Sequence, residues 1–171
     1  MFSVSSSKDV YLSAHVSVVL GADAFIGAPA DNSAEINLER RVDYPFAQVG
    51  LMITAFNPRG EILVQEENEL RNTSLLSELL ALGIQPIKCS GYDPKSAHSE
   101  ASFLILDNEE TMEILTLELA QKYGQRTIFR ISNGSRELLY TDHIQSSFSQ
   151  SFAWWRGRSS RIGGVVGEIN H

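Results

Sequence analysis

The sequence predicts an α+β protein in which two helices pack on one face of a mostly antiparallel sheet, with a ferredoxin-like topology as the leading arrangement. Three observations support this prediction: leucines recur at helical spacing in two segments, short apolar stretches lie around them, and one hairpin signal is strong. A chain of 171 residues is long enough for one well-buried core. We therefore expect a single α+β domain over residues 1–141 and an irregular tail over residues 142–171.

The first clear element is the apolar run Val49–Phe56, which ends at Asn57-Pro58 as a strand covered on both faces does. A helix follows from about Glu66 to Leu82, because glutamates occupy its first turn, leucines share one stripe and a glycine comes directly after it. The N-terminal secondary structure is left open. Two short apolar segments occur there, His15–Leu20 and Ala24–Ala28.

The later part of the domain contains two short strands, a second helix and a hairpin. The second helix is expected from about Glu109 to Tyr123, with Gly124 just past its end. The dipeptide Asn133-Gly134 is the strongest hairpin signal in the chain. The strands expected around these features are Ile84–Ser90, Ser102–Leu106, Arg126–Ser132 and Arg136–Thr141.

The residues after Asp142 differ in composition, being rich in serine, glycine, arginine and tryptophan. No helix or strand period persists there, so we expect an extension that is disordered or binds a protein partner. Arginines beside tryptophans can also bind nucleic acid. However, the net charge of the chain is −7, which disfavours a phosphate backbone as partner. The residues concerned are Trp154, Trp155, Arg156, Arg158 and Arg161.

A candidate polar site lies at the start of the first helix. Counting back along the helix from Leu75 and Leu79 places Asn72 and Asn68 on the buried stripe. A buried amide without a partner costs about 1–3 kcal/mol, so these side chains need partners. The turn at Asn57 is one candidate, and Arg71 with the helix N-terminus could hold a carboxylate or phosphate group.

The order of several motifs is similar to that of the domain of unknown function family 3293. These motifs are ITAFNP, EENELRN, the turn GYDP followed by HSEASFLI, and YGQRTIF. The resemblance extends from about Tyr11 to Thr141 and implies a domain, but it supplies no reaction because the family is uncharacterised. It points to one set of residues for a common test: Asn57, Asn68, Arg71, Asn72, Glu100 and Gln125.

Three functions remain open at this stage. The preferred one is a small cytoplasmic binding or regulatory protein whose polar site takes a small anionic or nucleotide-like ligand. Arg71 would be its anion contact, and Glu100 would either hold Arg71 or accept hydrogen bonds from the ligand. The second is an enzyme acting on a nucleotide-like substrate, because His98 and Glu100 would share one face of a strand and form an acid–base pair. The third is a protein-interaction or inhibitor module. A purely structural role, in which these side chains satisfy one another, is also open.

Other chemistries are disfavoured by the sequence. Cys89 is the single cysteine, so an intramolecular disulfide and a multi-cysteine metal site are excluded, and the four histidines show no metal-ligand spacing. We therefore expect no metal and no cofactor. A Nudix-type site lacks its paired carboxylates, since Leu80 and Ala81 occupy those positions. No stretch reaches the ~20 apolar residues of a membrane span, and Val16–Ala24 is a poor signal peptide.

Overall fold

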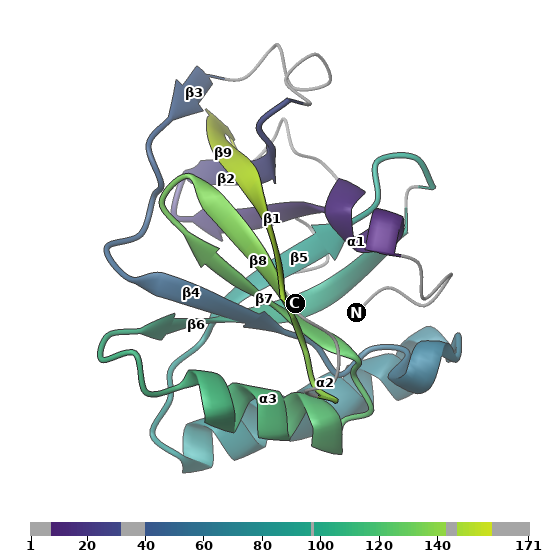
Figure 1. Ribbon diagram of the computed structural model, residues 1–171. Helices are drawn as coiled ribbons and strands as arrows, with labels where there is room; N and C mark the ends of the chain where they lie inside the picture. The colour runs from purple at the N-terminus through teal and green to yellow at the C-terminus, as the bar shows by residue number, and fades with distance from the viewer. Residues whose placement is uncertain (1–7, 32–39, 97, 143–146, 159–171) are drawn as a thin grey trace.

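The computed structural model describes residues 8–31, 40–96, 98–142 and 147–158, and within them the strands form a closed antiparallel barrel (Figure 1). The strand order is β2-β1-β5-β6-β4-β7-β8-β9, and β9 pairs back with β2, while β3 extends the sheet beside β9. The strands are β1 (His15–Leu20), β2 (Asp23–Pro29), β3 (Arg40–Val42), β4 (Val49–Ile53), β5 (Ile87–Tyr92), β6 (Ser99–Asp107), β7 (Thr127–Ser132), β8 (Ser135–Tyr140) and β9 (Phe148–Arg158). The helices are α1 (Lys8–Ser13), α2 (Gln65–Ala81) and α3 (Glu113–Lys122), with a short 3₁₀ turn, η2 (Pro58–Gly60).

The predicted ferredoxin-like sheet is wrong, because strands from both ends of the chain close the sheet into a barrel. The N-terminal strands β1 and β2, which local patterns left open, join β5 on one side and β9 on the other. Closure brings Gly27 of β2 opposite Trp154 of β9, 127 positions later in the sequence. A barrel in which β9 pairs with β2 has no free edge at either strand, which an open ferredoxin-like sheet would have.

The predicted irregular tail is also wrong for residues 148–158, which form the long strand β9. Phe152 and Trp154 face the barrel interior, as alternate residues of a strand must. The outward residues Ala153 and Trp155 are buried as well, in a small cluster with Ile26 and Ala28 of β2. Because both faces carry apolar side chains here, Phe152–Trp155 is a continuous apolar run. It lacks the alternation of apolar and polar residues by which a strand is predicted from sequence.

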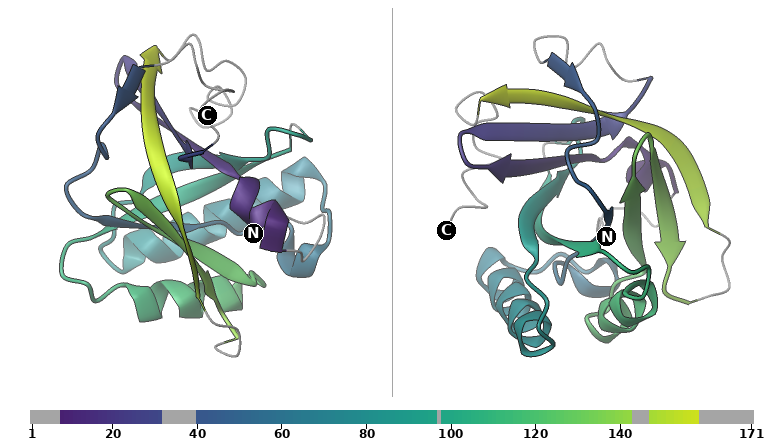
Figure 2. Two further views of the ribbon diagram at one scale, coloured as in Figure 1. Left: turned by 45° about the horizontal axis from the view of Figure 1, so that its top comes forward. Right: turned by 90° about the vertical axis from the view of Figure 1, so that its left-hand side faces the viewer.

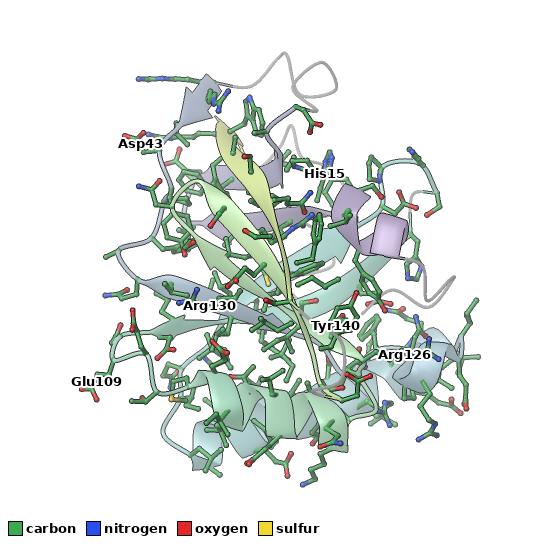
Figure 3. The ribbon with its side chains drawn as sticks, in the orientation of Figure 1. His15, Asp43, Glu109, Arg126, Arg130 and Tyr140 are labelled. Carbon is green, nitrogen blue, oxygen red and sulfur yellow. The ribbon has the colours of Figure 1, made fainter. Side chains whose placement is uncertain are left out.

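The barrel interior is filled by side chains rather than open. Met52, Leu104, Phe129 and Trp154 contribute to one continuous buried cluster there, and Figure 3 shows side chains throughout the space that the strands enclose. The rings of β9 need room on the neighbouring strand, since a Cβ at Gly27 would lie 2.4 Å from the Phe152 ring. Glycine at this position therefore allows β2 and β9 to pair and close the barrel.

The two predicted main helices are confirmed, and they lie side by side on the outer face of the barrel (Figure 2). Leu75 and Leu79 of α2 pack with Leu117 and Ala120 of α3 over the outward side chains of β4, β6 and β7. The hairpin signal is confirmed too: β7 and β8 pair around a turn in which Gly134 has a φ of 80°. Among the described residues, no helix combines the length and apolar character required to cross a membrane.

A buried arginine connects the barrel interior to α1. Arg136 of β8 is 1% exposed and lies between the rings of Phe129 and Phe152, with its Cζ 4.5 and 4.3 Å from their centroids. Its guanidinium donates hydrogen bonds to three main-chain carbonyl oxygens at the end of α1 and just beyond it, and to the side chain of Gln150. The carbonyl acceptors are Ala14 O at 2.6 Å, Tyr11 O at 3.2 Å and Leu12 O at 3.3 Å.

Candidate functional site

The chain leaves β4 through a tight turn that two asparagines hold. Asn57 has left-handed backbone angles, with φ 47° and ψ 64°, and its side chain is buried. Its Oδ1 accepts hydrogen bonds from Leu63 N at 3.0 Å and from Asn68 Nδ2 at 2.9 Å. In return, Asn57 N donates to Asn68 Oδ1 at 2.8 Å. The predicted inward orientation of Asn68 is therefore confirmed, and its partner is the turn at Asn57.

Three more side chains satisfy the main chain between β4 and this turn. Asn72 Oδ1 accepts from Ala55 N at 2.8 Å, and its Nδ2 donates to Ala101 O at 2.8 Å. Arg71 donates through Nε to Ala55 O at 2.8 Å and through Nη2 to Tyr123 O. Gln125 Nε2 donates to Phe56 O at 2.7 Å. We call the five side chains that hold this segment the turn cluster: Asn57, Asn68, Arg71, Asn72 and Gln125.

Residues outside the turn cluster also tie the segment to the chain just after α3. Arg59 N donates to Gly124 O at 2.8 Å, and Arg126, which Figure 3 labels, donates to Arg59 O at 3.2 Å. Gly124 has a φ of 74°, and a Cβ there would lie 2.8 Å from Pro58 Cβ. This glycine therefore permits both the backbone conformation after α3 and the close approach of the turn.

Glu100 lies beside the turn cluster but does not hold Arg71. Its side chain is 0% exposed, and Oε1 accepts from Asn57 Nδ2 and from His98 Nε2, both at 3.2 Å. The predicted contact between Glu100 and Arg71 is wrong, because Arg71 is turned toward main-chain carbonyls instead. Among the described residues, Glu100 Oε2 has no hydrogen-bond partner.

His98 is the titratable member of this arrangement. Its side chain is 29% exposed and its Nε2 contacts the buried carboxylate of Glu100. The hydrogen bond that His98 donates to the Glu100 carboxylate raises the pKa of His98 above its ordinary value, and partial burial opposes that rise. The predicted pairing of His98 with Glu100 is thus present, whereas a catalytic role for the pair stays a prediction.

An open groove lies on the other side of Asn72, between α2 and the strands β5 and β6. Its volume is about 300 Å³. One wall is a stripe of α2 that includes Gln65, Glu69, Thr73 and Leu76, next to the buried stripe of the helix. The other wall and the floor come from β4–β6 and the segment after β4: Phe56, Lys88, Cys89, Ala101, Ser102 and Phe103.

Of the residues that the sequence indicated, Asn72 alone lines this groove. Sequence reasoning missed Lys88, which stands inside a predicted strand, and Glu69 and Thr73, which looked like ordinary exposed helix positions. Their spacing of four residues was the available signal, since such residues share one helix face. What they face depends on how α2 packs on β5 and β6, which local patterns do not contain. Cys89 also borders the groove, and burial raises the pKa of its thiol.

Fold and site together define a closed antiparallel β-barrel with an outer helical layer and a groove along one helix. Residues 53–128 match the model of the family described as "Protein of unknown function (DUF3293)". The matched region contains the whole turn cluster, Glu100 and the groove, but excludes β1, β2, β8 and β9. The comparison with curated proteins found no match.

Proposed function

We propose that this protein is a small-molecule-binding protein whose site is the groove between α2 and β5–β6. The observation that carries this proposal is the groove itself, because about 300 Å³ of open space is at the lower end of the range of ligand pockets, roughly 300–1,000 Å³. Its composition supports the same conclusion: apolar side chains from Leu76 and Phe103 lie beside a small number of polar groups. That mixture orients a ligand while burying its apolar part.

The turn cluster has a different role in this proposal. Its amide and guanidinium groups are already bonded to the main chain and to each other, so they have little capacity left for a ligand. Asn72 joins Ala55 and Ala101 and thereby holds α2 against β6. We infer that Asn72 is a positioning residue, which fixes the separation between α2 and β6 and therefore the width of the groove.

The lining favours a ligand with one anionic group and a planar or apolar part. Lys88 is exposed on β5 and is the cationic side chain among the lining residues. The carboxylate of Glu69 across the groove accepts a hydrogen bond from Gln65 Nε2 at 2.9 Å. A carboxylate or monophosphate beside Lys88 would leave the ring or chain of the ligand over Phe103 and Leu76. A small carboxylic acid or a mononucleotide fits this description.

The test is a thermal-shift screen with AMP, adenosine, benzoate and citrate, followed by chemical-shift mapping of any probe that raises the Tm. An anionic probe should perturb amides of Thr73 and Leu76 on α2 and of Lys88 on β5. Lys88→Met should reduce its affinity by about tenfold, as removal of one charge-assisted contact predicts. Lys95→Met is the matched control, because Lys95 is exposed outside the groove. Perturbations elsewhere, or equal binding by both variants, would contradict the proposal.

The alternatives have less support. His98 and Glu100 do not line the groove, so an acid–base enzyme acting there is not favoured by the geometry. A protein-interaction or inhibitor role stays a prediction. We place the protein in the cytoplasm, since its one cysteine is buried and needs no oxidising compartment.

A further inference from the structure

We propose that His98 and Glu100 form a pH-dependent contact that strengthens the attachment of the turn at Asn57 to β6 at acidic pH and weakens it at alkaline pH. The contact involves neither the groove nor a ligand. It affects the local stability of the segment between β4 and α2, which is the segment that the turn cluster holds.

The geometry makes Glu100 the link between the strand and the turn. Its Oε1 accepts from Asn57 Nδ2 and from His98 Nε2, and its Oε2 has no partner among the described residues. A fully buried carboxylate is costly unless donors compensate its charge. Here one of its two donors, the imidazole, changes its charge near neutral pH. Loss of that charge leaves the carboxylate with the neutral amide of Asn57 as its other donor.

The groups that face this pair come from several elements. Asp93, after β5, acts on His98 in the same direction as Glu100 and raises its pKa. Tyr11 of α1 faces Glu100, and burial raises the pKa of its hydroxyl above the ordinary value of 10.0. Tyr11 also faces Arg126, at the start of β7, and Tyr140 of β8. Of these groups, His98 is the one whose ordinary pKa, 6.5, lies between pH 6 and 8.5.

The direction of the pH effect follows from the raised pKa of His98. A group whose pKa is higher in the folded state binds its proton more tightly there, so protonation stabilises the fold. That stabilisation is complete below the ordinary pKa of 6.5. It is lost as the pH rises through the higher pKa of the folded state. Glu100 is fully buried beside Asn57, so opening of the turn would hydrate its carboxylate, weaken its pairing with His98 and return the pKa of His98 toward the ordinary value. Protonated His98 therefore favours the attached turn, and the attachment should be weakest above neutral pH.

Two main-chain amides report directly on this segment. Asn57 N is bonded to Asn68 Oδ1, and Leu63 N is bonded to Asn57 Oδ1, so both lose their acceptors when the turn detaches. Their hydrogen exchange, corrected for the intrinsic pH dependence, measures local opening. Amides within the paired strands β7 and β8 serve as internal references, because they do not depend on the turn.

The experiment compares exchange at pH 6.0 and 8.5 in the full-length chain and in His98→Gln, which keeps a donor but does not titrate. In the wild type, protection of Asn57 and Leu63 should fall by roughly five- to tenfold more than that of the references, the size expected when a charge-assisted bond becomes a neutral one. In His98→Gln this difference should vanish. Asp93→Asn should keep the pH dependence, since His98 and Glu100 remain, but its midpoint should move to lower pH, because Asp93 contributes to the raised pKa of His98.

Two outcomes would overturn the proposal. One is equal pH dependence at these amides in the wild type and in His98→Gln. The other is wild-type protection that changes no more at Asn57 and Leu63 than in the β7–β8 hairpin. Glu100→Gln provides an independent check, because it too should remove the pH dependence while keeping an acceptor for Asn57. A retained pH effect in that variant would count against the pair.

Discussion

Two buried polar centres hold this fold together, and they differ in how far apart their partners lie in the sequence. In the turn cluster, the asparagines of α2 bind main-chain groups 5 to 29 positions away. Inside the barrel, Arg136 binds carbonyls of residues 122 to 125 positions away. Both centres satisfy backbone groups at places where regular pairing ends. The first is visible in a helical stripe of the sequence, whereas the second exists only after the barrel has closed.

The two centres also differ in charge. Neutral amides do most of the bonding in the turn cluster, whereas the barrel interior contains a guanidinium whose acceptors are carbonyl oxygens. Arg136 Nη2 also donates to Gln150 Oε1 at 2.6 Å, and two phenylalanine rings flank the guanidinium plane. A planar cation with many donors can stack and bond simultaneously, which suits such a site. We therefore expect changes at Arg136 to cost more than changes at any single asparagine.

Arg136→Met should give the largest loss of stability. It removes the side-chain donor of the Ala14 carbonyl and one donor each from the Tyr11 and Leu12 carbonyls, which keep Ala14 N and Gln150 Nε2 as their remaining donors. An unsatisfied buried acceptor costs about 1–3 kcal/mol. After allowance for the charge that no longer needs burial, we expect a decrease of about 3 kcal/mol in the free energy of unfolding. Urea denaturation measures it. Arg136→Lys should lose less stability than Arg136→Met but remain below the wild type, since lysine has fewer hydrogen-bond donors than arginine. A loss of stability below about 1 kcal/mol would contradict the expectation that Arg136 contributes more than a single asparagine of the turn cluster.

Asn68→Leu tests the turn cluster in the same way. The variant keeps the size of the side chain but leaves Asn57 N without its acceptor, so we expect a loss of about 2 kcal/mol. Ser74→Ala is the control on the exposed face of α2 and should stay within about 0.5 kcal/mol of the wild type. Thermal unfolding of both variants provides the measurement. Equal stability of the two would mean that α2 holds the turn through apolar packing alone.

Gly124→Ala and Gly83→Ala form a matched pair. Both glycines follow a helix with positive φ, so either alanine costs about 1 kcal/mol in backbone strain. A Cβ at Gly83 meets open space, whereas one at Gly124 lies 2.8 Å from Pro58 Cβ. Gly124→Ala should therefore lose about 1 kcal/mol more than Gly83→Ala. Guanidinium denaturation measures the free energy of unfolding of both variants, and their difference gives the cost of the contact with Pro58. Equal losses of stability would show that the turn moves away from the new Cβ at no cost.

Arg130→Met should have the smallest effect. Arg130 lies on the same hairpin as Arg136 but on its outer face, where it pairs with Glu137 at 3.1 Å and Glu113 at 3.5 Å. Half-exposed ion pairs of this kind contribute about 0.2–1 kcal/mol and weaken with salt. The loss of stability should therefore be below about 1 kcal/mol and smaller still in 1 M NaCl. A loss as large as that of Arg136→Met would show that an outward arginine of this hairpin contributes as much to stability as an inward one.

Local patterns predicted several elements of residues 53–128, which match the family model, and the β7–β8 hairpin that lies mostly beyond them. The helices α2 and α3, the β7–β8 hairpin and the inward asparagines of α2 all follow from spacing within a few turns or residues. The partner of Glu100 was mispredicted, because opposite charges suggested Arg71. In the structure the guanidinium of Arg71 donates hydrogen bonds to the main-chain carbonyls of Ala55, after β4, and Tyr123, after α3. Such competition between acceptors depends on distances that the sequence does not contain.

Sequence by itself determined the helices α2 and α3, but not α1, and the two strands that pair around Asn133-Gly134, because those choices depend on neighbours a few residues away. Tertiary structure decided that the sheet closes, that Phe148–Arg158 is a strand, that Arg136 faces inward and that α2 forms one wall of a groove. The physical reason is that a β-strand is stabilised by its pairing with residues far away in the sequence. The residue pattern of one strand does not show which partner it will have. The register of β9 against β2 is therefore the feature that only the folded chain defines.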